Sequence, residues 1–274
     1  MRGRFAPSPT GPLHFGSLVT ALASYLDARA HGGQWLVRLE DIDPLREVSG
    51  TAATILRQLT NHGLTWDGPV LYQSSRLAVY LDIVHQLLAA GLAYPCDCSR
   101  QRLHALGDIY DGHCRHRNLT LSNCAVRLRV PDNTFIEFED LIQGPQSQNL
   151  NQSVGDFIIW RRDGLPAYQL AVTVDDAFQG INHVIRGSDL LESTGRQIFL
   201  MGLLGYPPPR YGHVPLALNA DGQKLSKQNR APSLDASPAA DNLRRALAWL
   251  GITASGSDDI PVLLADAIPR WQRK

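Results

Sequence analysis

The stretch RFAPSPTGPLHFGS, residues 4–17, decides the fold that we expect for this chain. Its prolines and glycines predict a tight loop, and an apolar run with helical spacing follows over residues 18–29. Gly32 and Gly33 stand where that helix would end in a left-handed cap, and residues 35–40 have the pattern of a strand. A glycine-bearing loop, a helix and a strand begin a βαβ unit, and the crevice of a sheet built from such units binds nucleotides.

Periodic segments farther along the chain predict further elements. Amphipathic helices are expected at about 49–62 and 76–90, and Asp189 with Glu192 forms a capping box for a helix that runs to Leu204. More strands of the doubly wound sheet are expected at 157–160, 168–174 and 183–186. A last helix is expected at 241–250, behind a linker that contains prolines.

The periodic pattern is interrupted between residues 96 and 151 by short segments that carry cysteine, histidine and arginine. We therefore expect an α/β fold, a Rossmann-like doubly wound parallel sheet with a small insertion and a short helical C-terminal segment. The expected parts are the first half of the catalytic domain, the insertion, the second half and the tail, at residues 1–95, 96–151, 152–228 and 229–274.

Composition narrows the class of protein. With 274 residues and 44% hydrophobic content the chain can bury a sizeable core. Its formal net charge of zero excludes a surface coated in positive charge, so contact with nucleic acid must be local. No apolar run approaches the roughly 18 residues of a membrane span, and no secretory leader is visible, so we expect a cytoplasmic monomer without membrane contact.

A second motif, KLSKQ at residues 224–228, places two lysines around a serine in a segment too polar for a core. Attack of a carboxylate on the α-phosphate of ATP needs no general base, because a carboxylate is already ionised at neutral pH. The site must instead supply alignment and cations near the phosphates. His14 and Lys227 suit that task, and Gly16 permits close approach of the nucleotide.

The two motifs together resemble the paired ATP signatures of the class I aminoacyl-tRNA synthetases. Three further motifs, RLEDID at 38–43, YDGHC at 110–114 and RGSDL at 186–190, are similar to the glutamyl branch of that class. The resemblance implies that the chain activates L-glutamate with ATP and Mg²⁺, with His14 and Lys227 as catalytic residues. It implies an ATP site made of His14, Gly16, Ser17, Lys224, Ser226 and Lys227.

The charged groups of glutamate determine which residues its pocket must contain. Glutamate carries two carboxylates and an ammonium, so a pocket for it needs guanidinium groups and one buried anion. The resemblance implies that Glu40 faces the ammonium while arginines face the carboxylates. It implies a glutamate site lined by Arg4, Phe5, Ala6, Pro7, Ser8, Glu40, Tyr168 and Arg186.

Three closely spaced cysteines, Cys96, Cys98 and Cys114, have the compactness of a structural zinc site with one ligand still to be assigned. Spacing alone favours Cys124, His113 or His116 as the fourth ligand, because a phenol binds metal only when the ion deprotonates it. The family resemblance instead implies Tyr110. Reduced thiols without a metal are the alternative.

The RNA partner is suggested by two features of the chain. Six arginines in or just beyond the cysteine segment give it the best local claim to phosphate contact, namely Arg100, Arg102, Arg115, Arg117, Arg127 and Arg129. Residues 229–274, all that follows the lysine motif here, are few for an anticodon-binding domain. In this the chain resembles truncated glutamyl synthetases, which implies activation of glutamate without RNA and its transfer to queuosine in the anticodon loop of tRNA(Asp).

Three other functions fit parts of the sequence. A minimal glutamyl-tRNA synthetase would charge the 3′ end of tRNA(Glu). A zinc-containing RNA-binding module would show no glutamate-dependent exchange of pyrophosphate into ATP. A small-molecule nucleotidyltransferase would share the ATP motifs but give the cysteine segment no purpose.

Overall fold

A computed structural model describes residues 1–107, 109–217 and 233–271 of the chain. The opening loop leads from β1 (Arg2–Phe5) into α1 (Phe15–Ala30), and β2 (Gln34–Leu39) lies beside β1 in parallel register. Gly32, directly after the helix, has a φ of 60°, the left-handed conformation that glycine adopts without strain. The predicted βαβ unit is confirmed.

The parallel strands reverse their order beside β1. One sheet has the order β1, β2 and β3 (Leu71–Tyr72), and a second has the order β9 (His183–Gly187), β10 (Arg210–Val214), β6 (Phe135–Asp140) and β7 (Gly144–Asn149). β9 lies next to β1, and the Asn182 amide donates to the Arg2 carbonyl at 3.0 Å. β6 and β7 are antiparallel to each other, whereas the neighbouring pairs from β3 through β2 to β1 and from β9 through β10 to β6 are parallel. Strand order therefore reverses between β1 and β9, where a doubly wound sheet binds its ligand.

A third sheet is antiparallel and holds β4 (Ala93–Cys96), β5 (Ala125–Leu128) and β8 (Ile158–Trp160). The strand predicted at 157–160 exists, but its expected place in the doubly wound sheet is wrong, because β8 pairs with β5. The strand predicted at 183–186 is β9 and does belong to a parallel sheet.

All the predicted helices are present, but other helices were not predicted, and the predictions near residues 168 and 189 are wrong. The predicted helices correspond to α2 (Thr51–Asn61), α3 (Leu77–Ala89), α7 (Leu191–Leu204) and α8 (Ala239–Trp249). The predicted capping box is wrong, since a 3₁₀ turn precedes α7 and its N-cap is Leu190, which makes no side-chain capping bond. Residues 168–174, expected as a strand, belong to the helix α6 (Tyr168–Phe178). Three helices were not predicted: α4 (Arg100–Leu106), α5 (Leu150–Ser153) and α9 (Ile260–Trp271).

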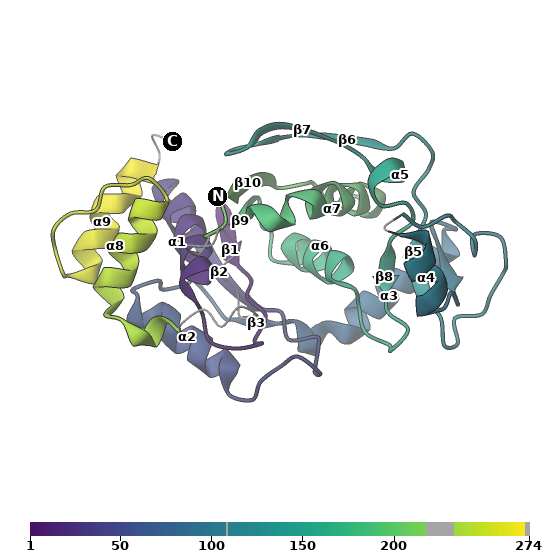
Figure 1. The fold of residues 1–274 in the computed structure, drawn as a ribbon, viewed down its shortest axis with the longest axis horizontal. Coiled ribbons are helices and arrows are strands. Elements are labelled where there is room, and N and C mark those ends of the chain that lie inside the picture. Colours follow the sequence, from purple (N-terminus) through teal and green to yellow (C-terminus); the bar gives the residue numbers. More distant parts are fainter. Residues whose placement is uncertain (108, 218–232, 272–274) are drawn as a thin grey trace.

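Two apolar cores hold the elongated molecule together. One surrounds α1, which is apolar on nearly all sides and is covered by α8 and α9 at one end of the molecule (Figure 1). The other joins α3, α6 and α7 to the antiparallel sheet, which lies at the opposite end. Within the described part of the chain, no helix has both the length and the apolar character needed to cross a bilayer.

Candidate functional site

A cavity of about 530 Å³ opens where the strand order reverses. Residues at the carboxyl ends of β1 and β9 form its walls, together with the start of α1 and the first residue of α6. All eight residues predicted to bind glutamate line it, as do His14, Gly16 and Ser17 of the predicted ATP site. Lys224, Ser226 and Lys227 lie outside the described residues. The residues predicted to bind glutamate and the described residues predicted to bind ATP therefore share one cavity.

The loop between β1 and α1 is held by backbone bonds to the segment that follows β2. The Glu40 amide donates to the Pro7 carbonyl at 3.0 Å, and the Val48 amide donates to the Pro9 carbonyl at 3.1 Å. His14 is the N-cap of α1, and its Nδ1 accepts the Ser17 amide at 3.3 Å. The amino terminus of this 16-residue helix thus reaches the cavity, where its unpaired amides favour an anion.

Glu40 presents to the cavity a carboxylate whose negative charge is only weakly offset by neighbouring cations. Its side chain is 10% exposed, and its nearest cation is Arg38, with Nη2 3.9 Å from Oε1. Among the described residues, no hydrogen bond to that carboxylate is found. Burial raises the pKa of Glu40 to about 7, since the loss of water, reinforced by Asp176 and Asp175, outweighs the attraction of Arg38 and Arg4. A buried carboxylate in this state is suited to a cationic ligand group.

Arg4 differs from the free guanidinium fork that the glutamate pocket was expected to contain. Its Nε and Nη2 donate to the two carboxylate oxygens of Asp176 at 3.1 and 3.2 Å, and both side chains are buried. Arg38, which is fully buried, reaches the same carboxylate at 2.8 Å. Burial alone would raise the pKa of Asp176, but Arg4 and Arg38 hold it below its usual range. Arg4 therefore lines the cavity as a member of an ion pair, in which two guanidinium groups share one carboxylate.

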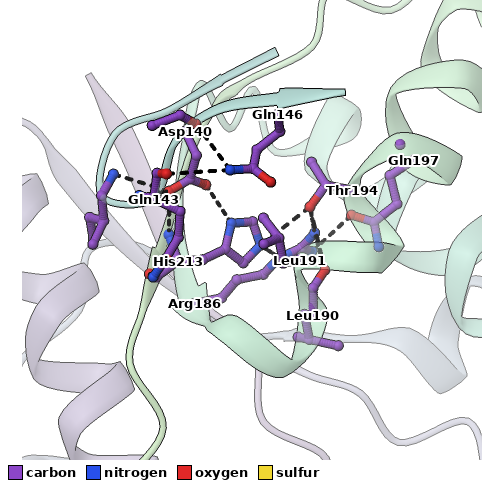
Figure 2. A network of polar contacts seen from close by, with 12 residues as sticks. Asp140, Gln143, Gln146, Arg186, Leu190, Leu191, Thr194, Gln197 and His213 are labelled. Carbon is purple, nitrogen blue, oxygen red and sulfur yellow. Dashed lines mark hydrogen bonds and ion pairs between the residues drawn. The ribbon is translucent and has the colours of Figure 1, made fainter. Parts of the chain in front are cut away.

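Arg186 contacts only uncharged groups among the described residues, and its contacts are drawn in Figure 2. It is 3% exposed, and its guanidinium donates to His213 Nε2 at 3.0 Å and to Gln197 Oε1 at 2.8 Å. It also donates to Thr194 Oγ1 at 2.9 Å and to the Leu190 carbonyl at 3.3 Å. All four acceptors are uncharged, and no carboxylate of the described residues lies within 4.0 Å of it. A buried cation without an ion pair is costly, so this guanidinium suits an anionic ligand in the cavity.

Tyr168 stands between the opposite charges of the site. It is the first residue of α6, it is half-buried and it lines the cavity. Burial raises the pKa of Tyr168, while the charges of Arg186 and Arg4 oppose that of Glu40. The phenol is therefore a neutral hydroxyl that can donate to or accept from a ligand.

The predicted zinc ligands lie together at the other end of the molecule. The Sγ atoms of Cys96, Cys98 and Cys114 lie within 4.8 Å of one another, and Tyr110 Oη is 3.5 Å from Cys96 Sγ and 3.4 Å from Cys98 Sγ. Within the described ranges, none of the alternatives suggested by spacing joins this group, namely Cys124, His113 and His116.

Three thiols and a phenol around one point are a donor set that fits zinc. Burial, and then hydrogen bonds with the thiols, raise the pKa of Tyr110 well above its usual range, so the phenol would ligate through deprotonation by the ion. The Arg127 guanidinium stacks 3.7 Å from the centre of the Tyr110 ring and donates to Cys96 Sγ at 3.3 Å. Its charge stabilises the anionic forms of both residues.

The arginines of the cysteine segment mostly bind the protein itself. Arg102, Arg115 and Arg117 form ion pairs with Asp111, Asp156 and Asp97 at 2.5–2.6 Å. Arg127 is buried, and Arg129 donates to the Arg115 carbonyl at 2.7 Å. Only Arg100, among the six named above, has no such bond within the part of the chain that the structure describes. Most of the arginines expected to bind phosphate are therefore already engaged within the protein, although the pairs of Arg102 and Arg117 lie at its surface.

Several polar residues of the site were missed by sequence reasoning. Asp176, which holds Arg4 and Arg38, and the pair Asp140 and His213, which holds Arg186, come from distant segments. The Asp175-Asp176 pair directly after an apolar run is the one signal that pointed to a buried carboxylate. Nothing in the local sequence marks Asp140 or His213.

Comparison with known proteins agrees with the fold. The family described as "tRNA synthetases class I (E and Q), catalytic domain" matches residues 1–260. A glutamyl-Q tRNA(Asp) synthetase of Pseudomonas aeruginosa is 55% identical over 249 residues, which cover 91% of this chain and 85% of the relative. That of Klebsiella pneumoniae is 52% identical over 276 residues, covering 98% of this chain and 93% of the relative.

Solved structures extend the comparison. A glutamate-tRNA synthetase from Elizabethkingia anophelis is similar with a TM-score of 0.82 at 28% identity, over 98% of this chain. This chain spans 65% of the length of that protein. A tyrosyl-tRNA synthetase from Archaeoglobus fulgidus, at 17% identity and a TM-score of 0.51, shares the fold. The chain belongs to the class I tRNA synthetases of the glutamyl and glutaminyl group, and is a ligase related to the glutamyl-Q tRNA(Asp) synthetases.

Proposed function

We propose that this enzyme activates L-glutamate with ATP and Mg²⁺ and transfers it to queuosine in the anticodon of tRNA(Asp). The names of its relatives support the glutamyl-Q reaction, and its fold is that of glutamate-tRNA synthetases. The observation that carries the proposal is a pair of opposite charges in one cavity: Glu40, which has only a long ion pair with Arg38, and Arg186, which has none with a described residue. An amino acid with an ammonium and an additional carboxylate complements both.

In the proposed reaction the protein must align glutamate with ATP and stabilise the negative charge that develops on the phosphates. The α-carboxylate of glutamate attacks the α-phosphate of ATP, the bond to the β-phosphate oxygen breaks, and pyrophosphate leaves with its Mg²⁺. The amino terminus of α1 and His14 would face the phosphates, where helix amides and an imidazole stabilise added negative charge. Lys227, for which we keep the role of phosphate-binding cation, lies outside the described residues. A hydroxyl of queuosine would then attack the adenylate and release AMP.

We further propose that Cys96, Cys98, Cys114 and Tyr110 hold one structural zinc ion. The ion would link the end of β4 to the loop that follows α4, a region with a small apolar cluster of its own. A metal in such a segment contributes folding free energy directly.

The proposed function is tested in two assays. Exchange of labelled pyrophosphate into ATP with each of the twenty amino acids, without RNA, should respond to glutamate alone. Acid-gel electrophoresis should then show glutamylation of tRNA(Asp) that contains queuosine, and none of queuosine-free tRNA(Asp) or of tRNA(Glu). Charging of tRNA(Glu) instead would establish the minimal glutamyl-tRNA synthetase, and absence of exchange would leave an RNA-binding module.

Arg186→Ala should affect the binding of glutamate and the binding of ATP differently. Removal of this buried cation, which lines the cavity and has no ion pair with a described residue, should raise the glutamate KM at least about tenfold, since hydrogen bonds to charged groups contribute about 1.5–3 kcal/mol. The KM for ATP should change less than about twofold. An equal loss for both ligands would mean that Arg186 supports the fold of the cavity rather than the glutamate carboxylate.

A further inference from the structure

A buried chain of three side chains runs from the end of β6 to the cavity. The Asp140 carboxylate accepts the Nδ1–H of His213 at 2.5 Å, and His213 Nε2 accepts the Nε–H of Arg186 at 3.0 Å (Figure 2). Asp140 and His213 are buried, at 1% and 0% exposure. Only Arg186, the last member, lines the cavity, so the other two act on a ligand through the guanidinium.

The contacts determine the tautomer of His213. A guanidinium can only donate, so Nε2 of His213 must carry a lone pair and the ring proton must lie on Nδ1, facing Asp140. Burial, assisted by the charge of Arg186, lowers the pKa of His213 despite the opposing effect of Asp140, which favours the neutral ring that the contacts require. Both bonds of the chain then have a donor and an acceptor.

The carboxylate at the far end is itself immobilised. Asp140 Oδ1 accepts the backbone amides of Ile142, Gln143 and His213 at 2.8–3.0 Å. The turn between β6 and β7 therefore leaves Oδ2 aimed at the imidazole. These bonds hold the pKa of Asp140 below its usual range although burial alone would raise it, and the group remains an acceptor.

A neutral ring between a carboxylate and a guanidinium has a specific electrostatic effect. Arg4 is in direct contact with Asp176, so a carboxylate that it shares with Arg38 offsets part of its positive charge. Arg186 is also oriented by an aspartate, but the neutral imidazole of His213 lies between its guanidinium and the Asp140 carboxylate. Its positive charge is therefore offset less and remains available to a ligand in the cavity. We infer that Asp140 and His213 are positioning residues for Arg186, which fix its guanidinium for a substrate carboxylate without neutralising it. This rests on the proposed function, in which that carboxylate belongs to glutamate.

Asp140→Asn tests the orientation of the ring with almost no change in shape. The amide oxygen of the substituted side chain would keep the three backbone donors, and its NH₂ would face Nδ1 of His213. The ring would then carry its proton on Nε2. Two N–H donors, those of His213 Nε2 and Arg186 Nε, would face each other, and the hydrogen bond between them would be lost. The glutamate KM should rise at least about tenfold while the ATP KM changes less than about twofold. Gln146→Ala, in the same hairpin but outside the chain of three, should leave both unchanged.

A second pair of variants covers the case in which Asp140→Asn does not fold. His213→Gln retains an amide with one donor and one acceptor, and His213→Leu has a similar size without either. The glutamine variant should keep the glutamate KM within about threefold of the wild type, and the leucine variant should raise it at least about tenfold. Equal KM values for these two variants would overturn the inference.

Nitrogen-15 NMR of histidine-labelled protein provides a readout that does not depend on activity. His213, assigned by the signal that His213→Gln removes, should show the Nδ1–H tautomer in the wild type and the Nε2–H tautomer in Asp140→Asn. A wild-type Nε2–H tautomer, or an unchanged glutamate KM in Asp140→Asn, contradicts the inference. Absence of glutamate-dependent exchange in the wild type would instead contradict the proposed function, while the tautomer still reports on the chain of three.

Discussion

Glu40 is the residue whose protonation has the clearest consequence for ligand binding. Its pKa near 7 means that the unliganded cavity exchanges a proton within the physiological range. An ammonium group requires the ionised form, so the glutamate KM should rise about tenfold as the pH falls from 8 to 6. Glu40→Gln should weaken glutamate binding at pH 8 and abolish this dependence. A wild-type KM that stays flat over the same range would contradict the assignment of Glu40 to the ammonium.

The same residue makes a prediction about stability. Its folded pKa lies above its ordinary 4.5, so the folded protein binds this proton more tightly than the unfolded chain. The stabilisation is complete below pH 4.5 and is lost as the pH rises through about 7. Glu40→Gln should therefore raise the free energy of unfolding at pH 8, by at most about 3 kcal/mol, and lose this advantage near pH 4.5. Thermal unfolding of both proteins at the two pH values measures the difference.

The residues of the site differed in how well the sequence predicted them. Arg4, Glu40, Tyr168 and Arg186 were named through motif resemblance, and all line the cavity. The resemblance gave no information on which arginine is compensated, because that depends on partners such as Asp176 from other segments. The local sequence identifies the groups that face the ligand in this site, whereas tertiary packing determines which of them have ion-pair partners.

At the scale of elements, the start of α1 combines two roles in His14. The side chain caps the helix by accepting the Ser17 amide, and it lines the cavity. His14→Ala should cost about 1 kcal/mol of stability, and so lower the unfolding temperature by about 2–4 °C, whereas His14→Asn should keep the cap. Both should reduce the rate of glutamate-dependent exchange at least about tenfold. Full activity in the asparagine variant would restrict His14 to the capping role.

The cysteine cluster gives a second prediction at this scale. Purified without chelator, the wild type should contain one zinc per chain, and Cys98→Ser should contain well under one and unfold at a lower temperature. Cys124→Ser is the matched control, since Cys124 is also buried but lies outside the group of three sulfurs. Metal analysis by mass spectrometry with thermal unfolding distinguishes these results. Metal-free wild type, or equal loss from both variants, would contradict the proposed site.

Helix α6 shows why one element was predicted wrongly. The segment YQLAVTV, residues 168–174, is rich in β-branched residues and short, so it has the pattern of a buried strand. In the structure it continues through Asp175 and Asp176 to Phe178, and Leu170, Ala171 and Val174 are buried in the second core. A helix packed on most sides has no polar face to reveal its period.

The molecule as a whole places its ligand cavity beside one core and its cysteine cluster near the other. The opening βαβ unit was predictable because a loop, a helix and a strand are contiguous in sequence. The pairing of β8 with β5 was not, because an isolated apolar strand does not specify its neighbours. Sequence pattern thus predicts elements, while long-range contacts select the sheet that each strand joins.

The contact between α1 and the C-terminal helices makes a prediction for the whole molecule. Leu247 of α8 is fully buried in the core around α1, and the Trp271 indole of α9 donates to the Asp27 carboxylate at 3.1 Å. Leu247→Ala should therefore cost about 2–5 kcal/mol and lower the single unfolding transition of the protein by about 5–15 °C. Leu77→Ala, which removes the same atoms at a more exposed position, should cost less than about 0.5 kcal/mol.

Far-UV circular dichroism and tryptophan fluorescence should report the same midpoint for Leu247→Ala, since Trp35 lies in the sheet beside α1 and Trp271 in α9. Coincident transitions mean that α8 and α9 unfold together with the helix that carries His14. An earlier transition of the C-terminal helices alone would show that they are a separate unit. Because α1 presents its amino terminus to the cavity, the first outcome places the C-terminal helices in the same cooperative unit as the helix that borders the cavity.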